Sequence, residues 1–244
     1  MADGASGAGP LLVLDNVSKR YGGLRAVSDL SLAIERGELR CLIGPNGAGK
    51  STVFKLIMGF DRPTAGTIRF EGAPINTWPT WRRARRGLSI KMQIPGIYPE
   101  LSVADNMRVA AQYHVSSGAM QEAIERLLAR VGLLGMGAEL AKNLSHGQQQ
   151  WLEIGMALSV NPKLLLLDEP TAGMGPGETE ATAGIVESLH ADGVTIMVIE
   201  HDMTFVRQIA RKVTVMNLGR LFAEGTIAEI EANQSVTDIY LGRT

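Results

Sequence analysis

A glycine-rich segment near the start of the chain carries the residue types that bind phosphate groups. It fits the pattern G-x-x-x-x-G-K-[ST] and runs through Gly44, Pro45, Asn46, Gly47, Ala48, Gly49, Lys50, Ser51 and then Thr52. Glycines let successive backbone N–H groups turn toward phosphate oxygens, and the N-terminus of a following helix adds positive partial charge. Lys50 can reach the β- and γ-phosphates, and the Ser51 hydroxyl can bind Mg²⁺. The segment therefore predicts a site for a nucleoside triphosphate.

Two carboxylates follow a run of four leucines later in the chain. Leu164–Leu167 is typical of a strand buried on both faces, and Asp168 and Glu169 come directly after it. Such strand ends face the crevice where α/β sheets hold their ligands. We expect Asp168 to hold Mg²⁺, directly or through water, and Glu169 to act as the general base on an attacking water. The alternative is a pair of solvated turn carboxylates, and the preceding phosphate-binding pattern argues against it.

The elements that must position these residues alternate between strands and helices. Period-two patterns predict strands at 12–14 and 30–34, and a continuous apolar run predicts a third strand at Leu39–Ile43. A helix is expected from about Lys50, with Gly59 as its end.

The middle of the chain has helical periodicity over residues 102–131, where Ser102 and Asp105 resemble a capping box. We expect the remaining elements in the following order: a helix after Gln148 to Ser159, a strand at 164–167, a helix at 178–190, a strand at 194–199, and a hairpin of 213–216 with 221–223 turned through 217–220. This order predicts an α/β fold. Its expected parts are a disordered leader at 1–10, a core at 11–93 and 149–244, and a helical lobe at 94–148.

The composition excludes several classes of protein. The chain has 244 residues, a formal net charge of −1 and a single cysteine, so it can form no intramolecular disulfide. Near-zero net charge argues against a general nucleic-acid or anionic-membrane binder. The longest apolar stretches fall far short of the roughly 20 residues that span a bilayer. The first ten residues lack the features of a signal peptide, so we expect a soluble, cytoplasmic chain.

One further segment resembles the signature of a known family. Leu144-Ser145-His146-Gly147-Gln148 is similar to the LSGGQ motif of ATP-binding-cassette (ABC) proteins, with His146 in the third position. Together with GPNGAGKST, Gln93, LLLLDEP and His201 in the family's order, the resemblance covers about residues 12–242. It implies a P-loop NTPase (RecA-like) α/β core with an antiparallel β subdomain and an inserted α-helical subdomain. It also implies a head-to-tail dimer, in which Ser145, Gly147 and Gln148 act in trans on the partner's ATP.

The resemblance assigns roles to three other residues. Tyr21 matches the aromatic residue that stacks on adenine, although an ordinary tyrosine is the alternative. Gln93 matches the glutamine that contacts Mg²⁺ or the lytic water, and by itself it would be an exposed polar residue. His201 matches the histidine that hydrogen-bonds to the γ-phosphate. With Lys50 and Glu169 these residues form the expected catalytic set, and Ser51, Gln93 and Asp168 form the expected metal set.

One position departs from the family. Gly175 stands where the family commonly has an aspartate that contacts the partner's phosphate loop, which puts that contact in doubt. The alternative interpretation is that Gly175 and Gly177 permit a sharp turn.

Longer segments point to a group within the family. LSHGQQQWLEIGMAL, DEPTAGM and VIEHDMTFV are similar to ATPases of importers for urea or short-chain amides and for branched-chain or hydrophobic amino acids. That resemblance implies a second related ATP-binding subunit, two membrane-spanning permease subunits and, indirectly, a solute-binding protein. It implies no nucleic acid and a place on the cytoplasmic face of the inner or plasma membrane. The segment from Arg82 to Val103 would form the floor of the groove for the permease.

Three alternatives remain at this point. A soluble, non-transport ABC ATPase shares every motif, but such proteins usually carry two cassettes or a long coiled coil. A simple P-loop kinase would lack LSHGQ and the histidine. The basic run of Arg82, Arg83, Arg85 and Arg86 is expected to be a solvated helix face, with contact to the permease or to lipid headgroups as the alternative.

Overall fold

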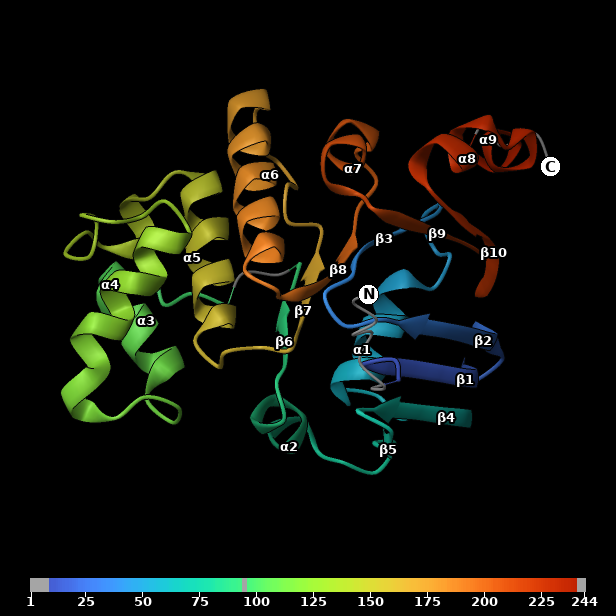
Figure 1. Cartoon of the computed structure of the whole chain (residues 1–244), viewed down its shortest axis with the longest axis horizontal. Coiled ribbons are helices and arrows are strands. Elements are labelled where there is room, and N and C mark those ends of the chain that lie inside the picture. Colours follow the sequence, from blue (N-terminus) through green and yellow to red (C-terminus); the bar gives the residue numbers. More distant parts are fainter. Residues whose placement is uncertain (1–8, 94–95, 241–244) are drawn as a thin grey trace, which may run out of the picture.

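The computed structural model describes residues 9–93 and 96–240, and it leaves the side chain of Tyr240 undescribed. Most of the predicted leader at 1–10, the first two residues of the predicted helical lobe and the end of the segment that resembles the ABC family lie outside the described residues. Figure 1 shows two sheets with a group of helices beyond the larger one.

The smaller sheet is antiparallel and has the order β2-β1-β4-β5. Its strands are β1 (Leu12–Tyr21), β2 (Leu24–Ile34), β4 (Ala65–Phe70) and β5 (Ala73–Pro74). The period-two pattern sets its register, because Leu12 lies opposite Ile34 and Leu14 opposite Leu32, all with buried side chains. This is the antiparallel β subdomain that the resemblance implies.

The larger sheet has the order β10-β9-β3-β8-β7-β6. Five of its strands are parallel, and only β10 runs antiparallel to its neighbour. The strands are β3 (Leu39–Ile43), β6 (Leu88–Lys91), β7 (Leu164–Asp168), β8 (Thr195–Ile199), β9 (Lys212–Asn217) and β10 (Arg220–Gly225). Every residue of β3, β7 and β8 is buried, as continuous apolar strands in a covered parallel sheet require.

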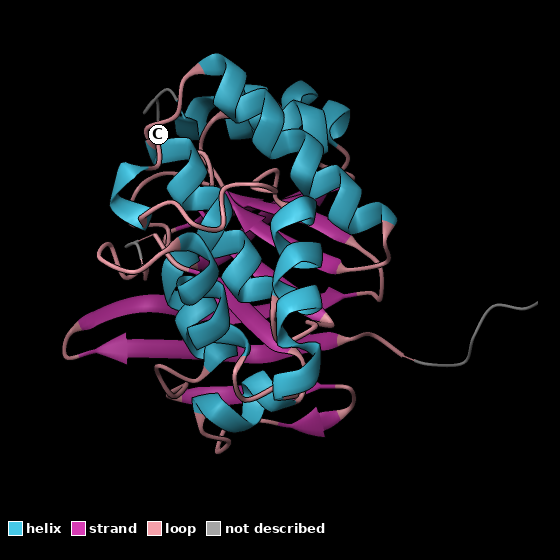
Figure 2. Cartoon of the chain, turned by 90° about the vertical axis from the view of Figure 1, so that its left-hand side faces the viewer, coloured by secondary structure: helices cyan, strands magenta, loops and turns pink. Residues whose placement is uncertain are grey.

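Helices cover both faces of the larger sheet. On one face, α1 (Lys50–Met58) fills the space against the smaller sheet, and its Val53, Phe54 and Ile57 pack with apolar residues of both sheets. Figure 2 shows several helices in front of the strands. The helices other than α1 are α2 (Thr80–Arg85), α3 (Val103–Ala111), α4 (Met120–Arg130), α5 (His146–Leu158), α6 (Pro176–Ala191), α7 (Met203–Ile209), α8 (Ile227–Ala232) and α9 (Gln234–Tyr240), with 3₁₀ turns at Ser117–Ala119 and Ala141–Asn143. Among the described residues, no helix is long and apolar enough to cross a membrane.

Most predicted elements are confirmed within a few residues, and one detail is wrong. The helix predicted after Gln148 begins at His146, because the Ser145 side chain caps it and accepts the Gln148 N–H. Residue 148, where the predicted lobe ends, lies in the first turn of α5, and the division into lobe and core stays a prediction. The predicted turn at 217–220 is confirmed: Asn217 pairs with Arg220, and Leu218 and Gly219 between them have the positive φ that a tight two-residue turn requires.

The basic run at residues 82–86 is a solvated face only in part. Arg83 is fully buried, and its guanidinium donates to the carbonyl oxygens of Leu56 and Ile57 at 2.7 Å each. It also donates to Ile75 O at 2.6 Å and to Trp78 O at 3.0 Å. The residue therefore satisfies the C-terminal carbonyls of α1, which a helix leaves without partners of its own. The exposed Arg82, by contrast, stacks on Trp78.

Candidate functional site

The glycine-rich loop joins β3 to α1, as the pattern predicts. Gly44 and Gly49 have φ of 147° and 100°, and the loop packs directly against neighbouring backbone there. A Cβ on Gly44 would lie 2.1 Å from Met216 O, and one on Gly49 would lie 2.3 Å from Ala26 O. Only glycine fits at these two positions. The loop thereby leads into the first turn of α1, whose N–H groups have no partners within the helix.

Lys50 is the first residue of α1, and its side chain folds back over the loop. The residue is buried, and its Nζ donates to Gly44 O at 2.7 Å and to Pro45 O at 3.1 Å. Burial lowers its pKa below the usual value, and the negative charges of Glu169 and Asp168 partly offset that shift. The ammonium is therefore already held at the place where phosphates would bind.

Asp168 ends β7 and has the environment of a metal ligand. Its side chain is buried, and Oδ1 has no hydrogen-bond partner within the described part of the chain. Burial, together with the charge of Glu169, raises its pKa to about 6, whereas Lys91, Ser51 and Lys50 oppose that shift. A buried carboxylate oxygen without a partner, beside a serine hydroxyl, suits an oxygen-seeking cation such as Mg²⁺.

Glu169 lies where three neighbouring strands end. Its backbone has a φ of 47°, and its N–H donates to Ile199 O at 3.0 Å. Gln93 follows β6, and its Nε2 donates to the Glu169 carboxylate at 2.9 Å. His201 follows β8, and its Nδ1 lies 3.7 Å from the same carboxylate. Since β6, β7 and β8 are adjacent in the sheet, the fold brings these three predicted residues together.

A cavity of about 650 Å³ opens over the loop. Its lining includes Tyr21, the segment 46–52, Gln93 and Glu169, all of which the sequence predicts. The Tyr21 hydroxyl donates to the Asp61 carboxylate. Burial, followed by that hydrogen bond, raises the pKa of Tyr21 to about 12. The tyrosine is 40% exposed, so its ring remains accessible to a planar base.

The cavity also includes residues that the sequence analysis missed. Arg25 belongs to the start of β2, and Leu218 belongs to the turn between β9 and β10. The turn reaches the loop because the Gly219 N–H donates to Ala48 O at 3.0 Å. No sequence motif identifies either residue, because the pairing of strands that are distant in the sequence brings them to the cavity.

The signature residues lie apart from this cavity. Ser145, Gly147 and Gln148 form the first turn of α5 and are absent from the described cavity lining. The Ser145 hydroxyl donates to Glu178 of α6 at 3.0 Å, and the His146 ring nitrogen Nε2 lies 2.8 Å from Ala172 O. The hydrogen bond from Ser145, followed by those from the Gly175 and Gly147 N–H groups, lowers the pKa of Glu178. The sequence analysis did not single out Glu178.

Gly175 does not serve a sharp turn. It is the N-cap of α6 with an extended φ of −75°, and a Cβ there, like one on Gly177, would meet nothing within 4 Å. The left-handed residue of this segment is Gly173, with a φ of 76°. The interpretation of Gly175 and Gly177 as turn residues is therefore wrong.

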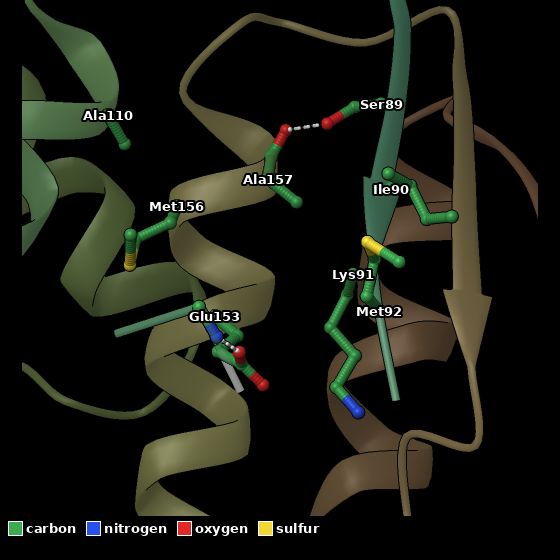
Figure 3. Close-up of a pocket in the computed structure, with 9 residues that line it drawn as sticks. Ser89, Ile90, Lys91, Met92, Ala110, Glu153, Met156 and Ala157 are labelled. Carbon is green, nitrogen blue, oxygen red and sulfur yellow. Dashed lines mark hydrogen bonds between the residues drawn. The ribbon is translucent and has the colours of Figure 1, made fainter. Parts of the chain in front are cut away.

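A second cavity of about 340 Å³ lies between β6 and α5. It is lined by Ser89, Ile90, Lys91, Met92, Gly96, Ala110, Glu153, Met156 and Ala157. Figure 3 shows Lys91 and Glu153 on its two sides, among apolar side chains. The Gly96 N–H donates to the Glu153 carboxylate, whose other oxygen has no partner among the described residues.

Comparisons with known proteins agree with this geometry. Residues 27–172, well over half of the chain, match the family model described as ABC transporter. The chain belongs to the ABC transporter family. It is accordingly an ABC ATPase, an ATP-binding transporter subunit that hydrolyses ATP, and the simple kinase alternative is excluded.

Individual relatives cover almost the whole chain. The high-affinity branched-chain amino acid transport ATP-binding protein LivG of Salmonella typhimurium is 37% identical over 96% of this chain and 98% of LivG. The lipopolysaccharide export system ATP-binding protein LptB of Escherichia coli is 33% identical over 95% of this chain and 97% of LptB. The ADP conformation of an ATP-binding cassette of an ABC transporter superposes with a TM-score of 0.87 at 29% identity, covering 96% of this chain and 99% of that one. The predicted fold class is thus confirmed.

Proposed function

We propose that this ABC ATPase powers an importer for branched-chain or hydrophobic amino acids, or for urea and short-chain amides. The observation that carries the proposal is the similarity to LivG, a branched-chain amino acid transport protein, over 96% of the chain. The similar segments around the signature and His201 support the urea and amide option. The chain is also similar to LptB, which belongs to an export system, so the direction of transport must be tested by experiment.

In the proposed hydrolysis, Tyr21 stacks on adenine while Gly44 to Thr52 surround the phosphates. Lys50 exchanges its two carbonyl partners for β- and γ-phosphate oxygens. Ser51, Asp168 and Gln93 would hold Mg²⁺, which would neutralise part of the phosphate charge. Glu169 removes the proton from the attacking water, and His201 donates a hydrogen bond to the γ-phosphate. The convergence of Gln93, Glu169 and His201 at one sheet edge supports this division of roles.

The complete site requires a second subunit. We propose that Ser145, Gly147 and Gln148 donate to the ATP of a related ATP-binding subunit, so that the working unit is a heterodimer. The separation of these residues from the cavity of their own chain supports action in trans. The first turn of α5 offers N–H and hydroxyl donors for a phosphate.

The cavity between β6 and α5 suits contact with a permease. Exposed Met92, Tyr98 and Leu101 lie on or close to the segment that lines it, and such exposed apolar side chains are typical of docking surfaces. We propose that two permease subunits dock here, and that a solute-binding protein supplies the solute from outside. The chain then lies on the cytoplasmic face of the membrane, without nucleic acid. In this proposal the lobe at 94–148 moves relative to the core at 11–93 and 149–244.

Purification of the tagged chain from its own detergent-solubilised membranes tests the assembly. We expect mass spectrometry to identify two membrane-spanning proteins and a second ATPase. Ribosomal or DNA-repair proteins without membrane proteins would instead contradict transport and favour a soluble ABC ATPase.

Reconstitution of that complex in vesicles then tests the solute and the direction. We expect ATP-dependent uptake of labelled leucine, valine, urea or acetamide by the wild-type complex, and none by the complex carrying Glu169→Gln. The substitution removes the base while keeping the shape of the side chain, so hydrolysis is expected to fall by about 10²-fold or more. Movement of solute in the opposite direction would contradict the importer.

A further inference from the structure

A buried lysine lies directly behind the proposed catalytic base. Lys91 is the last residue of β6 and is only 2% exposed. Its Nζ lies 3.3 Å from both Asp168 O and Glu169 O, and it donates to these two backbone carbonyls. Among the described residues it has no carboxylate within 4 Å. A buried ammonium that binds only carbonyls stabilises the fold less than an apolar side chain of the same size would, because its charge loses its hydration.

We propose that Lys91 is a positioning residue for Glu169. Two contacts, from β6 and from the residues directly after it, hold the proposed base: Lys91 binds the backbone carbonyl of Glu169, and Gln93 binds its carboxylate at 2.9 Å. The proposal rests on the role of Glu169 as the base. It adds that the backbone of this residue is held from β6 by a charged group, independently of the nucleotide.

The backbone of Glu169 needs such support. Its φ of 47° lies in the left-handed region, which a non-glycine residue keeps only where its surroundings fix it. The N–H on one side of this residue binds Ile199 O at 3.0 Å, and the carbonyl on the other side binds Lys91. Loss of the ammonium would free the carbonyl and let the carboxylate leave the position that the attacking water requires.

A buried carboxylate lies on the opposite wall of the cavity. Glu153 of α5 is buried, lies across the cavity from Lys91 in Figure 3, and accepts the Gly96 N–H from the segment after Gln93. Burial lowers the pKa of Lys91, and the negative charges of Glu153, Asp168, Glu200 and Glu169 partly offset that shift. The cavity that we propose for the permease is therefore bordered by the side chain that fixes the base.

Substitution of Lys91, with turnover measured in the assembled complex, tests the proposal. We expect Lys91→Met, which keeps the length of the side chain and removes its charge, to lower kcat for ATP by about 10- to 100-fold. The KM and the affinity for an ATP analogue should change by less than about 2-fold, because Lys91 does not line the nucleotide cavity. Lys91→Arg, which restores a cation, should recover part of the loss. Lys163→Met is the matched control, since this exposed lysine precedes the other end of β7, and its kcat should equal that of the wild type.

Rescue by a small amine shows whether a low kcat comes from the missing ammonium or from misfolding of the variant. Lys91→Ala leaves a space that opens into the 340 Å³ cavity and matches n-propylammonium. We expect this cation to raise the kcat of Lys91→Ala with saturation, and n-propanol, its neutral analogue, to have no effect. A kcat of Lys91→Met within 2-fold of wild type, or equal rescue by the alcohol and the amine, would overturn the proposal.

Glu169→Gln measured in parallel separates the role of Glu169 as the base from the role of Lys91 in positioning it. Wild-type turnover in Glu169→Gln would refute the role of Glu169. An inactive Glu169→Gln beside a fully active Lys91→Met would refute the role of Lys91 alone.

Discussion

The phosphate-binding region and the signature region of this chain differ in how much of the site each one completes. In the first, Lys50 and Asp168 are buried, and adjacent strands bring Gln93, Glu169 and His201 together. In the second, Ser145 is exposed and its hydroxyl binds a carboxylate of its own chain, Glu178. The first region is held by the core, while the second is held by surface contacts that a phosphate could replace.

Because of this difference, one chain can perform only some of the functions by itself. A buried cation held against two carbonyls needs only the arrival of phosphates to change partners. Donors at the start of a surface helix bind an anion only when one is brought to them. The isolated chain is therefore expected to bind nucleotide with its phosphate-binding region, whereas its signature contributes only after assembly.

The largest expected effect tests the phosphate-binding region. Lys50→Ala removes the buried ammonium, and we expect the affinity of the isolated chain for ATP to fall on the order of 10²-fold. Titration with a fluorescent ATP analogue measures it. Lys55→Ala is the control, because Lys55 is an exposed lysine on the same helix. Equal affinities for the two variants would show that the loop binds phosphate without its lysine.

The next effect concerns the helix that carries this region. Arg83→Met leaves several buried carbonyls without a donor, among them Leu56 O and Ile57 O at the end of α1. We expect the free energy of unfolding to fall by about 2 kcal/mol, measured by urea denaturation. Arg82→Met removes an exposed neighbour and should stay within about 0.5 kcal/mol of wild type. An equally small loss in Arg83→Met would mean that water replaces the guanidinium.

A smaller effect tests the signature region. Ser145→Ala removes a hydroxyl that we expect to reach the partner's γ-phosphate, so turnover of the assembled complex should fall about 10-fold. ATP binding by the isolated chain should remain unchanged. Ser102→Ala provides the control, since it also removes a helix N-cap, at α3, and costs about 1 kcal/mol of stability. If both variants lower turnover equally, capping rather than phosphate contact explains the loss.

The sequence predicted the two regions unequally, for a physical reason. The loop, the strand before it and the carboxylates at the end of β7 form local patterns, and the structure confirms these elements. Strand order, in contrast, depends on long-range pairing. It brings Leu218 to the loop and Lys91 behind Glu169, and no local pattern announces either contact.

Arg83 is a second contact that the local sequence pattern does not reveal. Within a run of arginines its charge indicated a solvated face, because a sequence pattern does not reveal a cluster of unpaired carbonyls. The helix end that needs such a donor becomes visible only when α1 and α2 pack together. Buried polar groups that serve backbone atoms are therefore the residues that sequence patterns identify least well.

The smallest effect concerns Gly175, where the family commonly has an aspartate. Because its φ is ordinary and a Cβ would meet nothing within 4 Å, Gly175→Asp should fold as well as wild type. A carboxylate there could hydrogen-bond to the partner's phosphate loop, and we expect the ATP concentration that half-saturates turnover of the assembled complex to fall about 3-fold. Gly177→Asp adds the same charge two residues further along the chain, within the first turn of α6, and should leave that concentration unchanged. The same change in both variants would instead point to a general effect of negative charge at the start of α6, and not to a specific contact of residue 175 with the partner's loop.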